Sequence, residues 1–225
     1  VICSDKTGTL TKNEMTVRAV WTSRAAYEVT GTGYDPAGEF RTAAGPVDPG
    51  AHPDLRRALA VGVLCNNAEL RSEDGRAKVF GDPTEIAILS AAAKAGIWKA
   101  AEAETYELVE EIPFDSERKK MTIVRRDGQD LVALTKGAPD LLLCDCVAIL
   151  EDGAERPLTE ADRERIMAAN DGYSDQALRV LAMAYRTLDR EPHSYAAEAI
   201  ERDLTFAGLV AMIDPPRPEV REAMA

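Results

Sequence analysis

Three apolar runs that lie close together in the chain constrain its fold most strongly. Residues 106–112, 120–126 and 130–135 either alternate apolar with polar side chains or are apolar nearly throughout, as strands are. Asp127 and Gly128 stand between the second run and the third, and an Asp-Gly pair is typical of tight hairpin turns. We therefore predict neighbouring strands that include a β-hairpin.

The rest of the chain indicates both strands and helices. Further strands are expected at 14–22, 26–32, 178–186 and 204–213, with a small hairpin over 147–158. Apolar spacing and cap residues predict helices at 53–65, 83–95, 138–143 and 159–174. Residues 33–51 are rich in Gly, Pro and Ala without clear periodicity, which indicates a loop.

The composition argues against one large class of function. The chain of 225 residues has a formal net charge of −12, whereas proteins that bind nucleic acid usually present a basic surface. Hydrophobic residues make up 45% of the chain, which is enough to form a core. No apolar run approaches the roughly 18–20 residues that cross a bilayer. We expect an acidic, soluble, cytosolic domain that binds no nucleic acid.

The cysteines give little indication of a metal site. Cys144 and Cys146 are closer together than the pairs of an ordinary zinc knuckle, no second pair follows, and the two histidines lie far from them in the sequence. With Cys3 and Cys65 they are expected to be reduced thiols, most of them buried.

The segment DKTGTLT near the start of the chain has the residues of a reactive site. Asp5 follows a short apolar run, and an aspartate at the end of a buried strand can attack a phosphoryl group to form an aspartyl-phosphate. That chemistry needs Mg²⁺ to neutralise the phosphate, and Gly8 would let the backbone turn closely around it. The alternative is a polar Asx turn, which is common for this type of sequence.

DKTGTLT resembles the phosphorylation motif of the P-type ATPases, the ion pumps of the haloacid-dehalogenase-like superfamily. This resemblance implies that Asp5 is the phosphorylated aspartate and that the Thr7 carbonyl is a Mg²⁺ ligand. Five later segments resemble motifs of the same family in the same order: GDPTE (81–85), FDSERKKM (114–121), KGAP (136–139), LRVLAMAYR (178–186) and DPPR (214–217).

By this resemblance the chain is the nucleotide-binding domain of a longer pump. Residues 1–12 would be a fragment of the phosphorylation domain, 13–213 the nucleotide-binding domain, and 214–225 the return hinge with the start of the remaining phosphorylation domain. The implied fold is α/β, a twisted, mainly antiparallel sheet flanked by helices. The hinge residues would be Asp214, Pro215, Pro216 and Arg217.

The resemblance also assigns residues to the adenine end of an ATP site. Phe114 would stack on adenine, although a core position is an even alternative from the residues alone, because only 5% of the chain is aromatic. Lys136, at the end of an apolar strand, and Gly137 would line the pocket, the alternative for the lysine being an ordinary solvated position. Glu85 would accept a hydrogen bond from the adenine amino group, or merely complement a helix dipole.

Further residues complete the expected site. By resemblance Lys119 contacts the nucleotide, Met121 packs beside the adenine, and Arg179 contacts the ATP phosphates. Arg179 is read as a mid-strand arginine, which needs a carboxylate or phosphate partner if it is buried. The only basic cluster is expected to form a positive patch suited to a triphosphate, or else a solvated strand face; it comprises Arg118, Lys119, Lys120, Arg125 and Arg126.

The resulting interpretation is the ATP-binding domain of an ion-transporting ATPase with ATP and Mg²⁺ as cofactors. The segments GDPTE and CNNAEL are most similar to those of bacterial calcium pumps, which places the domain on the cytoplasmic side of a plasma membrane. Its partners would be ATP and the remaining phosphorylation, actuator and transmembrane domains of the same pump. Two alternatives are a fragment of a haloacid-dehalogenase-type phosphatase and a non-catalytic regulatory module.

Overall fold

One large mixed sheet organises the chain. The computed structural model describes residues 9–73, 76–188, 192–215, 217 and 219–220. Within them eleven strands form a single sheet, whose main path runs β4-β3-β2-β1-β13-β12-β9-β8-β7. All neighbours on this path are antiparallel, and only the side branch β10 pairs with β13 in parallel.

The strands of this sheet are β1 (Thr16–Trp21), β2 (Ala26–Val29), β3 (Phe40–Thr42), β4 (Gly45–Val47), β7 (Tyr106–Asp115), β8 (Lys120–Asp127), β9 (Asp130–Gly137), β10 (Cys146–Glu151), β11 (Ala154–Pro157), β12 (Arg179–Leu188) and β13 (Leu204–Ile213). A separate two-stranded sheet consists of β5 (Glu69–Glu73) and β6 (Arg76–Phe80). The helices are α1 (Pro53–Leu64), α2 (Pro83–Lys94), α3 (Lys99–Thr105), α4 (Pro139–Cys144), α5 (Glu160–Ser174) and α6 (Ala197–Ile200), with a 3-10 turn at Pro49–Ala51.

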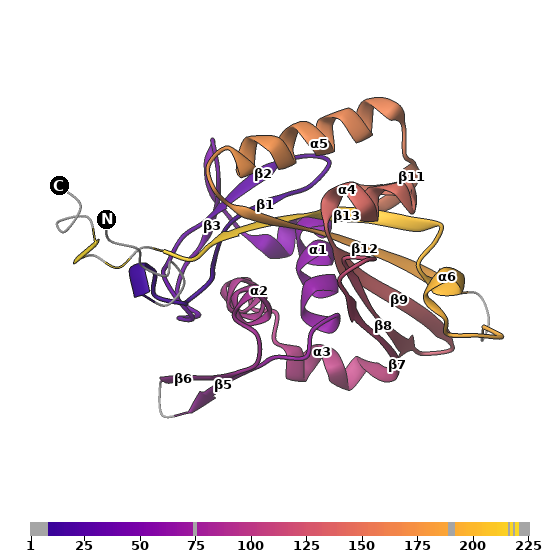
Figure 1. The fold of residues 1–225 in the computed structure, drawn as a ribbon, viewed down its shortest axis with the longest axis horizontal. Helices are drawn as coiled ribbons and strands as arrows, with labels where there is room; N and C mark the ends of the chain where they lie inside the picture. Colours follow the sequence, from indigo (N-terminus) through magenta and orange to yellow (C-terminus); the bar gives the residue numbers. More distant parts are fainter. Residues whose placement is uncertain (1–8, 74–75, 189–191, 216, 218, 221–225) are drawn as a thin grey trace.

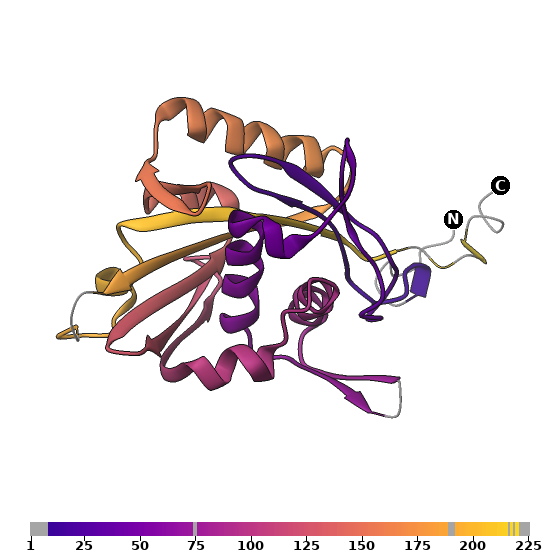
Figure 2. The same ribbon diagram turned by 180° about the vertical axis from the view of Figure 1, so that it is seen from behind.

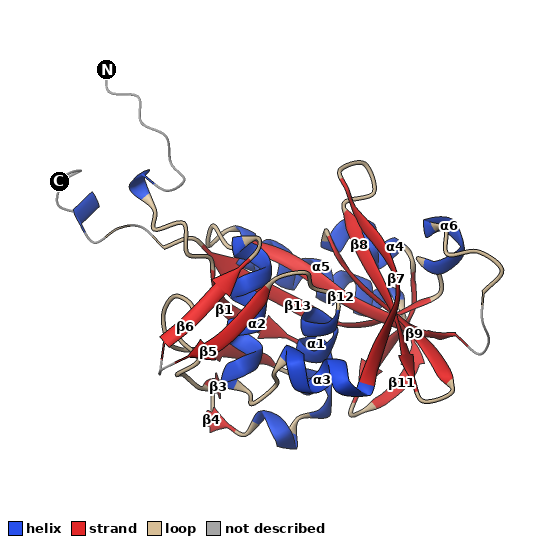
Figure 3. Cartoon of the chain, turned by 90° about the horizontal axis from the view of Figure 1, so that it is seen from below, coloured by secondary structure: helices blue, strands red, loops and turns tan. Residues whose placement is uncertain are grey.

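Helices cover both faces of the sheet. Helices α1 and α2 lie on one face of the large sheet and α4 and α5 on the other (Figures 1 and 2). In the view from below, α1 and α2 lie in front of the central strands β12 and β13 (Figure 3). Alternation along β12 sends Met183 and Tyr185 into the core beneath α1 and α2, and Ala182 and Ala184 into the core beneath α4 and α5. Two covered faces explain why β13 is apolar almost throughout.

Local sequence signals account for the helix and hairpin boundaries that were predicted. Helix α2 begins where Asp82 accepts a hydrogen bond from the Thr84 N–H, with Pro83 in its first turn. Asp127 pairs with Asp130 across the β8–β9 turn, in which Gly128 has φ +61°. The predicted helices and the main strands are confirmed within a few residues.

Two parts of the sequence-based description were wrong or incomplete. The segment 33–51, predicted as loop, contains β3, β4 and a 3-10 turn, because Phe40 is fully buried and pairs with Val29 and Val47 of the neighbouring strands. The β5–β6 hairpin and α3 were not predicted. The segment predicted as the end of a strand (1–4) and the first part of the phosphorylation motif, with Asp5 and Thr7, lie outside the described residues, which begin at Thr9.

The first and last strands of the domain pair with each other. Thr16 of β1 lies opposite Ile213 of β13, so that the chain enters and leaves the sheet side by side. The pairing continues beyond the strands, where the Lys12 N–H donates to the Pro215 carbonyl at 3.1 Å and the Glu14 N–H donates to an Asp214 carboxylate oxygen at 3.2 Å. Among the described residues, no helix has the length and apolar character needed to traverse a membrane.

The α5 capping box gives a prediction for stability. The Asp162 carboxylate accepts hydrogen bonds from the Thr159 N–H and hydroxyl and from the Arg156 guanidinium, which holds the pKa of this carboxyl well below its usual range. Asp162→Ala should lower the free energy of unfolding at pH 7 by about 1–3 kcal/mol.

A carboxyl whose pKa is lowered by folding stabilises the folded state at pH values above its pKa in the unfolded chain, and this stabilisation is lost as the carboxyl is protonated. The difference in unfolding free energy between Asp162→Ala and wild type should therefore shrink as the pH falls below about 4. Urea unfolding at several pH values measures this. Glu164→Ala, on the exposed side of the same helix, is the control and should change little at any pH. A deficit that stays constant down to pH 2 would contradict the role assigned to the charge.

Candidate functional site

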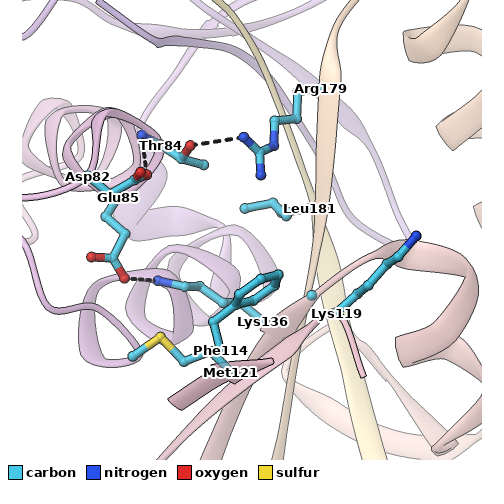
Figure 4. A pocket seen from close by; sticks show the side chains of 10 residues that line it. Asp82, Thr84, Glu85, Phe114, Lys119, Met121, Lys136, Arg179 and Leu181 are labelled. Carbon is cyan, nitrogen blue, oxygen red and sulfur yellow. Dashed lines mark hydrogen bonds and ion pairs between the residues drawn. The ribbon is translucent and has the colours of Figure 1, made fainter. Parts of the chain in front are cut away.

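A cavity of about 330 Å³ opens where α2 faces the β7–β8–β9–β12 part of the sheet. Figure 4 shows Arg179 and Thr84 at one end, Phe114 and Met121 at the other, and Leu181 between them. The lining residues are Asp82, Thr84, Glu85, Phe114, Lys119, Met121, Lys136, Gly137, Arg179 and Leu181. All seven residues that the family resemblance assigns to nucleotide binding are therefore brought to one cavity, although their roles stay predictions.

Phe114 reaches the cavity as an exposed aromatic ring. It lies near the end of β7, with 61% of its surface exposed, so the alternative of a core position is wrong. The pairing of β7 with β8 explains this exposure, because Ile112 lies opposite Thr122 and Asp115 opposite Lys120, leaving two residues on β7 against one on β8. Such a bulge re-aims the side chains that it contains.

An ion pair between Lys136 and Glu85 also lines the cavity. The Lys136 ammonium lies 2.5 Å from Glu85 Oε1, and the two side chains are 9% and 13% exposed. The other Glu85 oxygen accepts the Asn67 N–H at 3.2 Å, and the Asn66 amide donates to the Glu85 carbonyl at 3.0 Å. The reading of Lys136 as a solvated surface lysine is therefore wrong. The pair presents a hydrogen-bond donor and an acceptor side by side at the cavity.

Gly137 is required by the fold before any ligand is considered. A Cβ at this position would lie 2.6 Å from Lys120 Cγ and 2.7 Å from the Lys119 carbonyl oxygen, which is too close for any side chain. Lys119 itself has φ +50° and its carbonyl accepts the Ala138 N–H at 3.0 Å, so the turn before β8 is held against the end of β9. The glycine thus permits the close approach of the Lys119 backbone to the cavity.

Met121 makes the floor of the cavity apolar, and Cys65 is buried behind it. Met121 is 4% exposed and its carbonyl accepts a hydrogen bond from the fully buried Cys65 thiol at 3.4 Å. Burial raises the pKa of the Cys65 thiol to about 11, so it stays neutral and unreactive at physiological pH. A neutral, apolar floor suits the face of a planar heterocycle.

Arg179 is placed differently from the sequence-based expectation. It is the first residue of β12 and is exposed, not a buried mid-strand arginine, because the apolar part of the strand begins after it. It donates a hydrogen bond to the Thr84 hydroxyl at 3.3 Å. The arginine therefore lies at the open end of the cavity as a solvent-accessible cation.

The predicted basic patch does not form. Arg118 is paired with Glu201 at 2.6 Å, and Lys120 is paired with Asp145. Arg125 is buried and donates to two backbone carbonyls. Alternation along β8 and the turn before it send these cations in different directions, so Lys119 is the one member of the cluster that lines the cavity.

A second hollow of about 730 Å³ adjoins the cavity and reaches the paired ends of the chain. It shares Asp82, Thr84 and Arg179 with the cavity and extends to Asp214 at the expected hinge. An elongated ligand bound at Phe114 could therefore extend past Arg179 toward the segment that precedes β1.

Metal binding has less support from the described residues. They contain no group of three or more His, Cys, Asp or Glu side chains that could hold an ion. Cys65 and Cys146 are buried free thiols as expected, whereas Cys144 is exposed. The expected Mg²⁺ ligands, Asp5 and the Thr7 carbonyl, lie outside the described residues, as does Pro216 of the hinge.

Sequence reasoning missed the residues that hold the site together. Asn66 and Asn67 fix Glu85, and Thr84 contacts Arg179. The two asparagines directly follow the end of α1, where side-chain amides commonly satisfy free backbone groups, and that position was the available signal.

Comparison with known proteins gives consistent matches. A family model described as "P-type ATPase, cytoplasmic domain N" matches residues 54–219. Over its whole length the chain is 41% identical to a calcium-transporting ATPase of Bacillus subtilis and 42% identical to the cation-transporting ATPase pma1 of Synechocystis. It is also 41% identical to the probable cation-transporting ATPase F of Mycobacterium tuberculosis. The chain spans 25% of the length of each of these relatives.

The Lys136–Glu85 pair gives a second prediction. Lys136→Met should lower the free energy of unfolding by about 2–4 kcal/mol, because it leaves a largely buried carboxylate without its cation. The double variant Lys136→Met/Glu85→Gln should be more stable than the sum of the single effects by about 1–3 kcal/mol.

Chemical denaturation of the two single variants and the double variant completes the cycle. Arg56→Met, which breaks the more exposed pair with Glu102, should cost less than about 1 kcal/mol and serves as the control. Strict additivity at Lys136 and Glu85 would show that their contact contributes nothing to stability.

Proposed function

The chain belongs to the P-type ATPase family as its cytoplasmic N domain, and on that premise we propose that it binds ATP for an ion-transporting pump and delivers the γ-phosphate to an aspartate. The observation that carries this proposal is the cavity in which an exposed Phe114, a Glu85–Lys136 pair and the cation of Arg179 follow one another. Aromatic ring, polar edge and cation match the base and the phosphates of a nucleotide in that order.

The adenine ring is proposed to lie on Phe114 above the apolar floor that contains Met121. Stacking on an aromatic side chain contributes about 1–3 kcal/mol per base, so one exposed ring accounts for a large part of a weak affinity. Exposure of 61% is unfavourable for a phenylalanine in water, and covering the ring with a base removes that apolar surface.

The polar edge of the adenine is proposed to meet the ion pair. The amino group at the six-position donates hydrogen bonds, and the Glu85 carboxylate is an acceptor at the cavity wall. Lys136 supplies donors to the ring nitrogens next to it. Because Glu85 is already fixed by the Asn67 N–H, little side-chain entropy is lost when the base binds.

The triphosphate is proposed to run from Lys119 and Arg179 through the second hollow toward the hinge. Arg179 is accessible and presents a planar fork suited to phosphate oxygens. Thr84 holds that fork at the boundary shared by the two hollows. This direction leads to Asp214 and to the segment that precedes β1, which carries Asp5 at its start.

In the proposed reaction the Asp5 carboxylate attacks the γ-phosphorus, ADP leaves, and an aspartyl-phosphate forms. Mg²⁺, bound with the help of Asp5 and the Thr7 carbonyl, would neutralise the phosphate charge. The chain's own contribution is to hold the adenine end while the domains close about a hinge at Asp214, Pro215, Pro216 and Arg217.

Transport requires parts beyond this domain. The proposed partners are the remaining phosphorylation, actuator and transmembrane domains of the same protein, with this domain on the cytoplasmic side of a bacterial plasma membrane. The names of the relatives favour a cation as cargo, and calcium is the candidate that the Bacillus subtilis relative suggests.

A ligand series tests the proposed orientation of the nucleotide. ATP should bind this chain with a Kd between roughly 0.1 and several mM. Phe114→Ala should weaken ATP, ADP and adenosine alike, by at least about fivefold. Arg179→Ala should weaken ATP and ADP but leave adenosine unchanged within error, because adenosine has no phosphate.

Titration followed by NMR or calorimetry gives the three affinities for each variant. Arg156→Ala, on the opposite side of the domain near α5, removes an arginine of similar character and should leave all three unchanged. An equal loss of affinity for ATP, ADP and adenosine in Arg179→Ala would contradict a role of Arg179 in binding the phosphates.

The role of Asp5 is tested in the full-length protein that contains this chain. Incubation with ATP radiolabelled on its γ-phosphate should give an acid-stable label that hydroxylamine releases, as expected of an acyl phosphate. Asp5→Asn should abolish the label while ATP binding is retained. A label that persists in Asp5→Asn would place the acceptor at another residue.

A further inference from the structure

The bulge that exposes Phe114 has a dedicated support. Pro113 and Phe114 are the two residues of β7 that lie between the paired positions Ile112 and Asp115. The Arg118 guanidinium donates to the Pro113 carbonyl at 2.7 Å. This hydrogen bond acts on the peptide that immediately precedes Phe114, and it therefore constrains the backbone that carries the ring.

Arg118 is itself held from the other side by a buried carboxylate. Its NH1 group lies 2.6 Å from both oxygens of Glu201, whose side chain is only 3% exposed. Glu201 also accepts the Thr122 hydroxyl at 2.8 Å, and Lys120 lies 3.9 Å from its second oxygen. A buried carboxylate with this many donors has one available position, and so has the arginine that it binds.

The intervening turn is equally constrained. The Asp115 carboxylate accepts the N–H groups of Glu117 and Arg118, both at 2.9 Å, and these hydrogen bonds lower the pKa of its carboxyl. The Lys119 N–H donates to the Asp115 carbonyl at 2.7 Å. The turn that follows β7 thereby places the Arg118 side chain next to the bulge in β7.

We propose that Glu201 and Arg118 are positioning residues for nucleotide binding, which hold the β7 bulge so that Phe114 projects into the cavity. The inference rests on the proposed function, since it concerns the ring on which adenine would stack. Neither residue lines the cavity. Arg118 acts on the Pro113 carbonyl, and Glu201, which follows α6 and is 87 residues from Phe114 in the chain, acts through Arg118. The guanidinium is consequently committed to Glu201 and does not serve the phosphates.

The test measures the affinities for ATP and adenosine in Arg118→Gln and Glu201→Gln. Each variant should lower the affinity for ATP and the affinity for adenosine by the same factor, about three- to tenfold, because the defect affects binding of the base and not of the phosphates. Arg156→Gln is the matched control: Arg156 also bridges a buried carboxylate, Asp162, and a proline carbonyl, Pro157, but near α5. It should leave both affinities unchanged.

A second measurement separates positioning from general loosening of the fold. In a Phe114→Ala background, Arg118→Gln should weaken ATP by less than about twofold further, because the ring that it positions is absent. Arg118→Lys keeps the charge but not the two-sided fork, and it should resemble Arg118→Gln in the wild-type background. If Glu201→Gln yields no folded protein, the more exposed Arg118 carries the test.

The outcomes distinguish the inference from the function on which it rests. If Phe114→Ala binds ATP as tightly as wild type, the proposed site itself is wrong. If Phe114→Ala weakens ATP but Arg118→Gln and Glu201→Gln do not, the site stands and the positioning role is overturned. Equal losses from Arg118→Gln with and without Phe114 would overturn it as well, since they would show an effect that does not pass through the ring.

Discussion

The pairing of β1 with β13 is the contact on which the arrangement of the domain depends. It closes a span of about 200 residues by placing Thr16 opposite Ile213. It also places β13 at the centre of the sheet, where this strand pairs with β1, β12 and β10. Entry into and exit from the sheet are therefore adjacent, and the pairing continues to Lys12 and Pro215. This adjacency is what the proposed hinge at 214–217 would require.

The candidate site uses this rigid sheet through strand ends and irregularities. Lys136 is near the end of β9, Arg179 is the first residue of β12, and Phe114 lies in the β7 bulge. At Arg179 and Phe114 the ladder stops or shifts, so that an exposed side chain turns away from the core while its backbone stays fixed. Lys136 differs, because it is paired with both neighbouring strands and is buried against Glu85.

Several features could be predicted from short stretches of sequence. Asp82 with Pro83, Thr159 with Asp162, and the Asp127-Gly128 turn each marked a boundary that the structure confirms, because caps and turns depend on residues within four positions of one another. The five ordered family motifs likewise identified the domain, and the cavity gathers residues of four of them. The burial of Phe40 could not be predicted, because it depends on the strands β3 and β4, which a Gly- and Pro-rich segment gives no reason to expect.

Local pattern was therefore sufficient for most of the elements, for the family and for naming the candidate residues, because each of these depends on contiguous stretches of the chain. Tertiary structure alone decided how charges are distributed among them. Lys136 pairs with Glu85 across 51 residues. Arg118 pairs with Glu201 across 83 residues and Lys120 pairs with Asp145, so that two cations of the apparent basic patch are neutralised. Which carboxylate meets which cation depends on strand order and register, and these are set by packing of the whole sheet against helices on both of its faces.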